Sequence, residues 1–399
     1  MAKIGIYGGT FNPPHAGHIL AAQQCREQLG LDEVILIPAG IPPHKALTDG
    51  SPDAATRLAL TRRAAQGIDG LTVSDLEILR DGTSYTVDTL RQIKVNYHHD
   101  KLYLLMGTDM FLSFESWRSP EQIAKLARPV CLHRGRENPQ LKADIEQQAK
   151  KLKKLYGCAP ILLDNDYVEI SSTQVRRLLF FGCARAYLAP AVLEMIEAER
   201  LYGLDADYRA LPFDRLKEIS LSLLNPSRVA HVVGCCETAT ALARRFGANE
   251  RDAARAGILH DVTKALTGEQ QLRLCDRFSL PVTDFERAHP KLLHAKTGAA
   301  VAGSIFGENE DICRAIWYHT TGCAEMTTLE KIIYLADYIE PTRVFDGVEQ
   351  LREAVWRDLD AGMLLGLDMT LEHLREQGQP QAVDSIRARE WLLAKGTNA

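Results

Sequence analysis

Residues 8–18 read Gly8-Gly9-Thr10-Phe11-Asn12-Pro13-Pro14-His15-Ala16-Gly17-His18 and directly follow the short apolar run Ile4–Tyr7. A strand that ends in glycines and leads into a helix brings backbone N–H groups and the positive end of the helix dipole to one point, where an anion can bind. His15 and His18 are three residues apart, so both imidazoles can converge on one phosphate. A metal ion or a simple loop cap would also suit two histidines, but neither explains the glycine and proline pairs around them. The stretch therefore predicts a strand, a phosphate-binding loop and a helix, in that order.

The first half of the chain alternates short apolar runs with stretches of helical periodicity, such as Ile19–Leu29 and Ala54–Ala65. The runs lack alternation between apolar and polar residues, which indicates strands that are buried on both faces. The order of strand and helix predicts a parallel, doubly wound sheet, so we expect residues 1–203 to form an α/β domain with a Rossmann-like fold. The runs are Ile4–Tyr7, Val34–Pro38, Leu71–Val73, Leu102–Met106, Pro129–Leu132 and Ile161–Leu163.

The character of the chain changes after about Gly203. Strand-like runs stop, and long amphipathic stretches begin at helix-start signals such as Asn225-Pro226 and Asn249-Glu250. We therefore expect a second, all-α domain over residues 213–399. The expected junction is the short segment Leu204–Pro212.

The composition is that of a soluble globular protein and argues against several functional classes. The chain has 399 residues, too many for one ordinary domain, of which 46% are hydrophobic and 25% charged. A net charge of −5 argues against a general nucleic-acid binder. The nine cysteines form no C-x-x-C pair, and no run suits a signal peptide or a membrane-spanning helix. We expect a cytoplasmic protein without nucleic-acid or membrane partners; its oligomeric state, a homo-oligomer included, stays open.

A second anion-binding pattern is Ile170-Ser171-Ser172-Thr173-Gln174-Val175-Arg176. Ser and Thr residues at a helix start offer hydroxyls and exposed backbone amides. Arg176 can point into the same anion site and hold a β- or γ-phosphate. A helix cap alone would account for the hydroxyl residues but would leave Arg176 unexplained.

Both patterns resemble the signatures of the nucleotidyltransferase superfamily with a Rossmann-like fold. Within that superfamily, residues 3–200 are similar to the nicotinate mononucleotide adenylyltransferases. The resemblance implies transfer of AMP from ATP, which brings Mg²⁺, to nicotinate mononucleotide, giving deamido-NAD and pyrophosphate in NAD biosynthesis. Transfer to pantetheine phosphate and cytidylyl transfer share the first motif but not the Ser-Tyr-Thr segment paired with a tryptophan. The matching segments are Ile41-Pro42-Pro43-His44-Lys45, Ser84-Tyr85-Thr86-Val87-Asp88-Thr89-Leu90, Gly107-Thr108-Asp109 and Trp117.

The same resemblance implies roles for individual residues. Tyr85 and Thr86 would read the nicotinate carboxylate, and Trp117 would stack on the pyridine ring, although a partly buried core position would also suit this tryptophan. Asp109 would orient the ribose. The candidates for catalysis are His15, His18 and Arg176; the remaining candidates for binding ATP or substrate are Gly8, Gly9, Thr10, Phe11, Gly107, Ser171, Ser172 and Thr173, with Lys45, Arg57 and Arg134 as phosphate partners.

The second half contains an adjacent pair, His260-Asp261, together with further histidines and a second aspartate in or at the ends of expected helices. A lone histidine on a helix is more often a core residue than a ligand. A carboxylate beside an imidazole is a stronger signal, because it gives one metal a ligand and can bridge to a second. The candidate metal ligands are His231, His260, Asp261, His294, His319 and Asp337.

This order resembles the HD-domain metallohydrolases over about residues 213–395, and the local contexts resemble the subfamily that hydrolyses diadenosine tetraphosphate symmetrically to ADP. The resemblance implies two first-row transition metals, iron or manganese, that activate water for in-line attack on phosphorus. Asp261 would bridge the metals and belong to the catalytic set with Lys264, which would clamp a phosphate. Arg228 and Arg343 are further candidates for clamping.

Two alternatives for the second half stay open. It could be a regulatory tail that binds a nucleotide without catalysis, or a phosphoesterase for a different substrate. A domain that had lost catalysis would be expected to have lost a metal ligand, and none of the six is missing, so we favour an enzyme. His289 lies outside the Leu-Leu-His context of His294 and is not included among the ligands.

Overall fold

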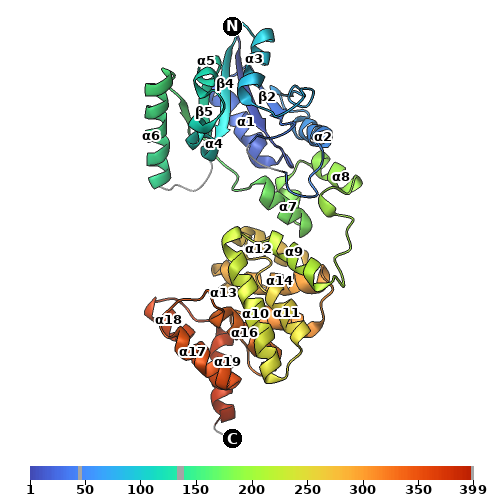
Figure 1. The fold of residues 1–399 in the computed structure, drawn as a ribbon, viewed down its shortest axis with the longest axis vertical. Helices are drawn as coiled ribbons and strands as arrows, with labels where there is room; N and C mark the ends of the chain where they lie inside the picture. Colours follow the sequence, from blue (N-terminus) through green and yellow to red (C-terminus); the bar gives the residue numbers. More distant parts are fainter. Residues whose placement is uncertain (44–46, 133–138, 397–399) are drawn as a thin grey trace. The chain divides into compact units, whose positions relative to one another are not determined.

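The computed structural model describes residues 1–43, 47–132 and 139–396, and the chain divides into two compact units, Met1–Ala206 and Asp207–Ala399 (Figure 1). The division lies inside the segment Leu204–Pro212. Each unit has its own arrangement of elements, so each is described separately.

The strands of the first unit form one parallel sheet in the order β3-β2-β1-β4-β5-β6. The expected α/β fold is confirmed. The strand order reverses between β1 and β4, and in such sheets the carboxyl ends of the strands at the reversal frame a crevice for ligands. The strands are β1 (Lys3–Gly9), β2 (Glu33–Pro38), β3 (Leu71–Val73), β4 (Lys101–Gly107), β5 (Arg128–Leu132) and β6 (Ile161–Leu163).

The sheet is buried on both faces, which explains why its strands lack polar alternation. In β2, Ile35 and Ile37 belong to one hydrophobic core, whereas Val34 and Leu36 belong to the other. Successive side chains of a strand point to opposite faces, so both sets must be apolar. The helices are α1 (Ala16–Leu29), α2 (Ala54–Ala65), α3 (Thr86–Asn96), α4 (Thr108–Leu112), α5 (Pro120–Leu126), α6 (Pro139–Tyr156), α7 (Ser172–Phe180) and α8 (Pro190–Ala198).

The regular elements among the described residues of the second unit are all helices, as the sequence predicts. Asn249 caps the helix that follows it, accepting hydrogen bonds from two backbone amides of the first turn. Gly257 lets two helices approach closely, because a Cβ at this position would lie 2.8 Å from the Cα of Cys236. The helices are α9 (Phe213–Ser222), α10 (Val229–Phe246), α11 (Glu250–Leu259), α12 (Gly268–Arg277), α13 (Asp284–Ala288), α14 (Leu293–Ser304), α15 (Glu310–Tyr318), α16 (Thr328–Ile339), α17 (Val348–Arg357), α18 (Leu359–Glu376) and α19 (Val383–Gly396).

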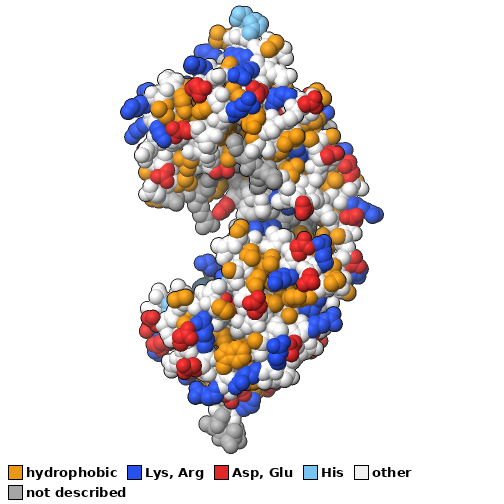
Figure 2. Space-filling model, viewed as in Figure 1, with side chains coloured by type: hydrophobic (Ala, Val, Ile, Leu, Met, Phe, Trp, Pro, Cys, Tyr) orange, Lys and Arg blue, Asp and Glu red, His pale blue; other side chains and the backbone are white. Residues whose placement is uncertain are grey.

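The surface carries mixed charge. Figure 2 shows acidic and basic side chains interspersed on both units, with hydrophobic side chains scattered between them. This distribution agrees with the near balance of 47 basic and 52 acidic residues in the sequence. Among the described helices, none is both long enough and apolar enough to cross a lipid bilayer.

Candidate functional site

The first unit contains a cavity of about 480 Å³ where β1, β2 and β4 end. This is the crevice expected at the reversal of strand order. Both anion-binding patterns of the sequence line it, although they are separated by more than 150 residues. The predicted residues along its wall are Gly8, Gly9, Thr10, Phe11, His15, His18, Thr86, Gly107, Asp109, Trp117, Ser171, Ser172, Thr173 and Arg176.

The two histidines of the first motif lie at the start of α1 with their ring centroids 3.7 Å apart. His15 is the N-cap residue, and its backbone N–H donates to Nδ1 of His18 over 3.3 Å. A neutral His18 that accepts at Nδ1 carries its proton on Nε2, which makes Nε2 a hydrogen-bond donor for a phosphate. Gly17 leaves room for this pair, because a Cβ there would lie 3.2 Å from the His15 ring.

Arg176 joins the second motif to the first. Its Nη1 donates to the backbone carbonyl of Asn12 over 2.7 Å, and Ser172 Oγ donates to the carbonyl of Pro13 over 3.0 Å. Burial lowers the pKa of Arg176, yet a guanidinium stays charged at neutral pH. Its other terminal nitrogen, Nη2, donates to the hydroxyl of Thr173 over 3.3 Å. A half-buried cation beside a loop of amides suits an anionic ligand.

Of the three residues predicted to bind nicotinate mononucleotide, two line the cavity and one lies at the edge of the core. Thr86 and Trp117 line the cavity, and Trp117 also packs against Phe114 with ring centroids 5.5 Å apart. Tyr85 does not line it; its ring packs at the edge of a core under the guanidinium of Arg118, 4.5 Å away. A direct contact of the Tyr85 ring with the nicotinate carboxylate therefore stays a prediction.

Arg57 lies beneath the first motif and does not line the cavity. It is fully buried, and its guanidinium donates to the carbonyls of Thr10 over 2.8 Å and Gly40 over 3.0 Å. In this position it braces the loop and adds positive charge behind it, and its role as a direct phosphate partner stays a prediction. Lys45 and Arg134, the other two predicted phosphate partners, lie outside the described residues.

Sequence reasoning did not single out some cavity residues. Ser84 accepts a hydrogen bond from the backbone N–H of Gly40 over 3.0 Å, and Glu77 accepts one from Thr89 Oγ1 over 2.6 Å. Burial raises the pKa of Glu77 above its ordinary value. Ser84 opens a segment that the sequence had flagged, whereas a lone glutamate such as Glu77 carries no local signal.

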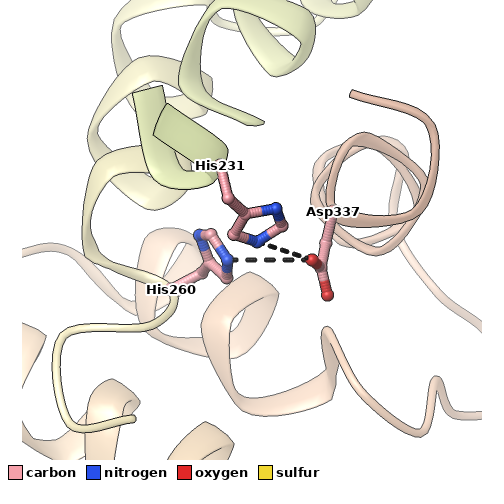
Figure 3. A group of neighbouring side chains, drawn as sticks. All are labelled: His231, His260 and Asp337. Carbon is pink, nitrogen blue, oxygen red and sulfur yellow. Dashed lines mark ion pairs between the residues drawn. The ribbon is translucent and has the colours of Figure 1, made fainter. Parts of the chain in front are cut away.

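The second unit gathers all six predicted metal ligands into one buried cluster. Figure 3 shows that His231, from α10, and His260, at the end of α11, point toward Asp337 on α16. Nε2 of His231 lies 3.0 Å and Nε2 of His260 lies 3.9 Å from Asp337 Oδ1. Around Asp261 the distances from its carboxylate oxygens to the ligand Nε2 atoms are 3.5 Å for His260, 3.2 Å for His294 and 3.8 Å for His319.

The Nδ1 atom of every histidine in the cluster faces an acceptor. The partners are backbone carbonyls for His260 (2.8 Å, Gly257), His294 (2.5 Å, Lys291) and His319 (2.7 Å, Ile316), and the carboxylate of Glu340 for His231 (3.0 Å). A carbonyl can only accept, so the proton of each neutral imidazole resides on Nδ1 and its Nε2 carries no proton, as coordination of a metal requires. This arrangement of outer hydrogen bonds is typical of histidines that bind metals.

The charges in the cluster also fit metal ions. Burial alone would raise the pKa of Asp261, but His260 and His294 outweigh it and hold that pKa well below its usual range. Burial lowers the pKa of His294, and it lowers the pKa of His319 together with the neighbouring imidazoles. At His260, burial would lower the pKa, but Cys235 and Asp261 outweigh it and hold that pKa well above its usual range. The site thus presents ionised carboxylates beside two imidazoles with lowered pKa, and a metal ion would displace the proton of His260.

Three potential ligand atoms directly support the binding of metal ions at this cluster. His231 Nε2, His260 Nε2 and Asp261 Oδ1 are shielded from solvent and lack a well-oriented hydrogen bond within the described residues. Buried polar atoms without partners are costly, and a cation would compensate them. Two triads have ligand atoms within 4.8 Å of one another, and both include His260: His231, His260 and Asp337, and His260, Asp261 and His319.

Three cations surround the mouth of the cluster. Arg228 Nε donates to Asp261 Oδ2 over 2.6 Å, Arg343 Nε donates to the carbonyl of Asp337 over 2.7 Å, and Lys264 Nζ lies 2.9 Å from His294 Nε2. Their side chains are 29%, 32% and 36% exposed, whereas the histidines are almost fully buried. The open side of the cluster is therefore positive and suits a polyanionic substrate.

Comparison with known proteins assigns a family to each half of the chain. The model of the cytidylyltransferase-like family matches residues 6–178, and that of the HD domain matches residues 228–342. The chain is 36% identical over 212 residues to a protein of Citrifermentans bemidjiense named "probable nicotinate-nucleotide adenylyltransferase", covering 50% of this chain and 98% of that one. The equally named protein of Borreliella burgdorferi is 34% identical over 201 residues, covering 50% and 96%.

A solved structure of an HD protein is among those similar to this chain. It is described as a predicted HD superfamily hydrolase involved in NAD metabolism from Clostridium acetobutylicum, and it is 34% identical to this chain with a TM-score of 0.45, covering 46% of this chain and 98% of that one. The chain therefore belongs, through its N-terminal half, to the nicotinate-nucleotide adenylyltransferase family, and its C-terminal half is an HD domain.

Proposed function

We propose that the chain is bifunctional. Its N-terminal domain transfers AMP from ATP to nicotinate mononucleotide, releasing pyrophosphate and forming deamido-NAD. Its HD domain hydrolyses diadenosine tetraphosphate symmetrically to two ADP. The first activity is supported chiefly by the convergence of both anion-binding motifs on one cavity.

The N-terminal residues suit in-line transfer. A phosphate oxygen of nicotinate mononucleotide attacks the α-phosphorus of ATP, and the bond to the oxygen that leaves with pyrophosphate breaks. This reaction needs alignment and donors on the developing charge more than covalent help from the protein. Nε2–H of His18, the guanidinium of Arg176 and the amides of the Gly8-Gly9 loop are such donors, and Mg²⁺ arrives with ATP.

Nicotinate mononucleotide is proposed as the acceptor of the adenylyl group because Thr86 and Trp117 line the cavity. An indole stacks well on a flat, electron-poor pyridine ring. The test offers the full chain ATP with nicotinate mononucleotide, with nicotinamide mononucleotide or with phosphopantetheine. We expect turnover with the nicotinate form to dominate, and a strong preference for the nicotinamide form would contradict the proposed role of Thr86.

The HD activity rests on one observation: the four histidines and two aspartates lie in one cluster, in which two triads share His260 and the sixth residue, His294, has Nε2 3.2 Å from Asp261 Oδ1. His231, His260, Asp261, His294, His319 and Asp337 would hold two divalent ions, with Asp261 shared between them. Such a pair supplies activation of water and stabilisation of charge in phosphoryl transfer. Lys264, Arg228 and Arg343 would orient the phosphates and neutralise their charge.

The HD proposal is tested by metal content and product identity. The protein is expressed with iron and manganese supplied, its metals are counted by elemental analysis, and diadenosine tetraphosphate is offered. We expect about two metals per chain and ADP as the sole product, with turnover lost in Asp261→Asn. Fewer than one metal per chain, or release of AMP and ATP, would contradict it. Turnover of other phosphoesters alone would indicate a different phosphoesterase, and nucleotide binding without turnover a regulatory domain.

A further inference from the structure

Asn12, in the first motif, connects three distant segments of the N-terminal domain. It is 4% exposed. Its backbone carbonyl accepts from Arg176 Nη1 over 2.7 Å, its Nδ2 donates to Ser51 Oγ over 2.8 Å, and its Oδ1 accepts from the hydroxyl of Tyr202 over 3.0 Å. Those partners are 164, 39 and 190 residues away in the sequence. The conformation of the loop at Asn12 is therefore fixed from outside the loop.

The loop needs external support because its backbone is unfavourable. Phe11 has φ of 48°, in the left-handed region that costs a residue with a side chain on the order of 1 kcal/mol or more. Such a conformation persists only where its surroundings hold it. Phe11 is 1% exposed, and its ring packs against that of His18 with centroids 5.0 Å apart, so the loop contacts the catalytic imidazole directly.

Tyr202, near the end of the domain, also lies in a segment with unfavourable backbone angles. It lies in the 3₁₀ turn η3 (Leu201–Gly203) with φ of 59°, and Arg200 just before it has φ of 52°. Burial raises the pKa of Tyr202, although Arg176 and Arg57 oppose the shift, so the hydroxyl is a protonated donor at neutral pH. Two left-handed residues in one short turn, neither of them glycine, indicate that contacts elsewhere offset their cost.

We propose that Tyr202 is a positioning residue for adenylyl transfer, whose hydroxyl holds Asn12 and thereby keeps the loop of residues 8–12 and the His18 imidazole aligned on the triphosphate. Tyr202 does not line the cavity and is not expected to touch ATP or nicotinate mononucleotide. It acts through Asn12, whose carbonyl also fixes the Arg176 guanidinium. One side chain at the end of the domain therefore supports a donor from each motif.

The test compares Tyr202→Phe, Tyr202→Leu and a matched control in the full chain. Phe keeps the ring and removes only the hydroxyl. We expect Tyr202→Phe to lower kcat for deamido-NAD formation about fivefold to tenfold, the effect of losing one net hydrogen bond in the aligned state, with KM for nicotinate mononucleotide within twofold. Tyr97→Phe removes a hydroxyl at the end of α3, away from the cavity, and should leave kcat unchanged.

A purely structural role gives different results. If only the ring mattered, Tyr202→Phe would restore the full kcat that Tyr202→Leu loses. A double-mutant cycle adds a second criterion: because Tyr202 acts through Asn12, Tyr202→Phe should have almost no further effect on Asn12→Leu. Wild-type kcat in Tyr202→Phe, additive effects in the cycle, or failure of Tyr202→Phe to fold would each overturn the proposal.

Discussion

Glu340 is the group whose replacement tests the HD centre most sharply without touching a metal ligand. Its carboxylate is fully buried and accepts from Nδ1 of His231 over 3.0 Å and from the backbone N–H of Thr342 over 2.7 Å. Gly234 makes room for it, because a Cβ there would lie 2.6 Å from Glu340 Oε2. Burial alone would raise the pKa of Glu340, but hydrogen bonds from Thr342 and His231 outweigh it and lower that pKa, so the group is ionised at neutral pH.

Glu340→Gln keeps the shape and removes the charge. One carboxylate oxygen faces His231 and the other faces the amide of Thr342, so the NH₂ group of a glutamine must point at one of these donors. Loss of one charge-assisted hydrogen bond costs about 1.5–3 kcal/mol. If the NH₂ turns toward His231, its ring loses the partner that fixes its tautomer and orientation. Changes of this kind weaken metal affinity about 10- to 100-fold, which corresponds to about 1.4–2.8 kcal/mol.

The assay is a competition for Mn²⁺ between the full-length protein and a fluorescent chelator at pH 7.5. We expect Glu340→Gln to weaken binding at one of the two sites by the stated factor and to leave deamido-NAD formation within twofold. Glu349→Gln is the matched control, since that side chain is 76% exposed and pairs with Arg352 on its own helix. Equal affinities in wild type and Glu340→Gln would refute the reasoning that Glu340 orients His231.

Three further outcomes are expected. Arg57→Met removes the donor from two partly buried carbonyls and should destabilise the N-terminal domain by about 2–4 kcal/mol in urea unfolding, with at least a tenfold loss of adenylyl transfer. With its metals removed by a chelator, the HD domain should lose stability as the pH falls below about 6.5. The pKa values of His294 and His319 are lowered in the folded state, so below that pH the unfolded chain binds more protons than the folded one. Calorimetry that shows greater stability at pH 5.5 than at pH 6.5 would contradict this. Gly257→Ala should destabilise the HD domain by about 1–3 kcal/mol in urea unfolding, because its Cβ meets the α10 backbone; an unchanged unfolding midpoint would contradict it.

The fold was predictable because its signals are local. Apolar runs without alternation indicate strands buried on both faces. The runs Val34–Pro38 and Leu102–Met106 lie within β2 and β4, respectively. The order of the strands in the sheet could not be predicted from such local patterns, because the pairing of β1 with β4 joins segments about a hundred residues apart. The cavity follows from that order, because it opens where β1 and β4 lie side by side.

The supporting residues of both sites were missed for a physical reason. The hydrogen bonds that give Tyr202 and Glu340 their supporting roles join them to partners 190 and 109 residues away. The sequence places Glu340 in residues 336–341, beside the ligand Asp337, and Tyr202 near the end of the first domain. Neither position indicates which distant residue the side chain contacts. Arg57 shows the converse: its charge suggested a phosphate partner, but the structure places its guanidinium on two backbone carbonyls.

The four histidine ligands differ in whether neighbouring or distant residues orient their rings. His260, His294 and His319 each direct Nδ1 at the carbonyl three residues earlier, so the turn that carries each histidine also orients its ring. His231 lies in the first turn of α10 and takes its acceptor from Glu340, beyond the end of α16. Three ligands are thus oriented by their own backbone, and the fourth depends on the correct docking of α16 against α10. Assembly of the triad that contains His231 and Asp337 should therefore report on tertiary packing, and it is the triad that Glu340→Gln is expected to weaken.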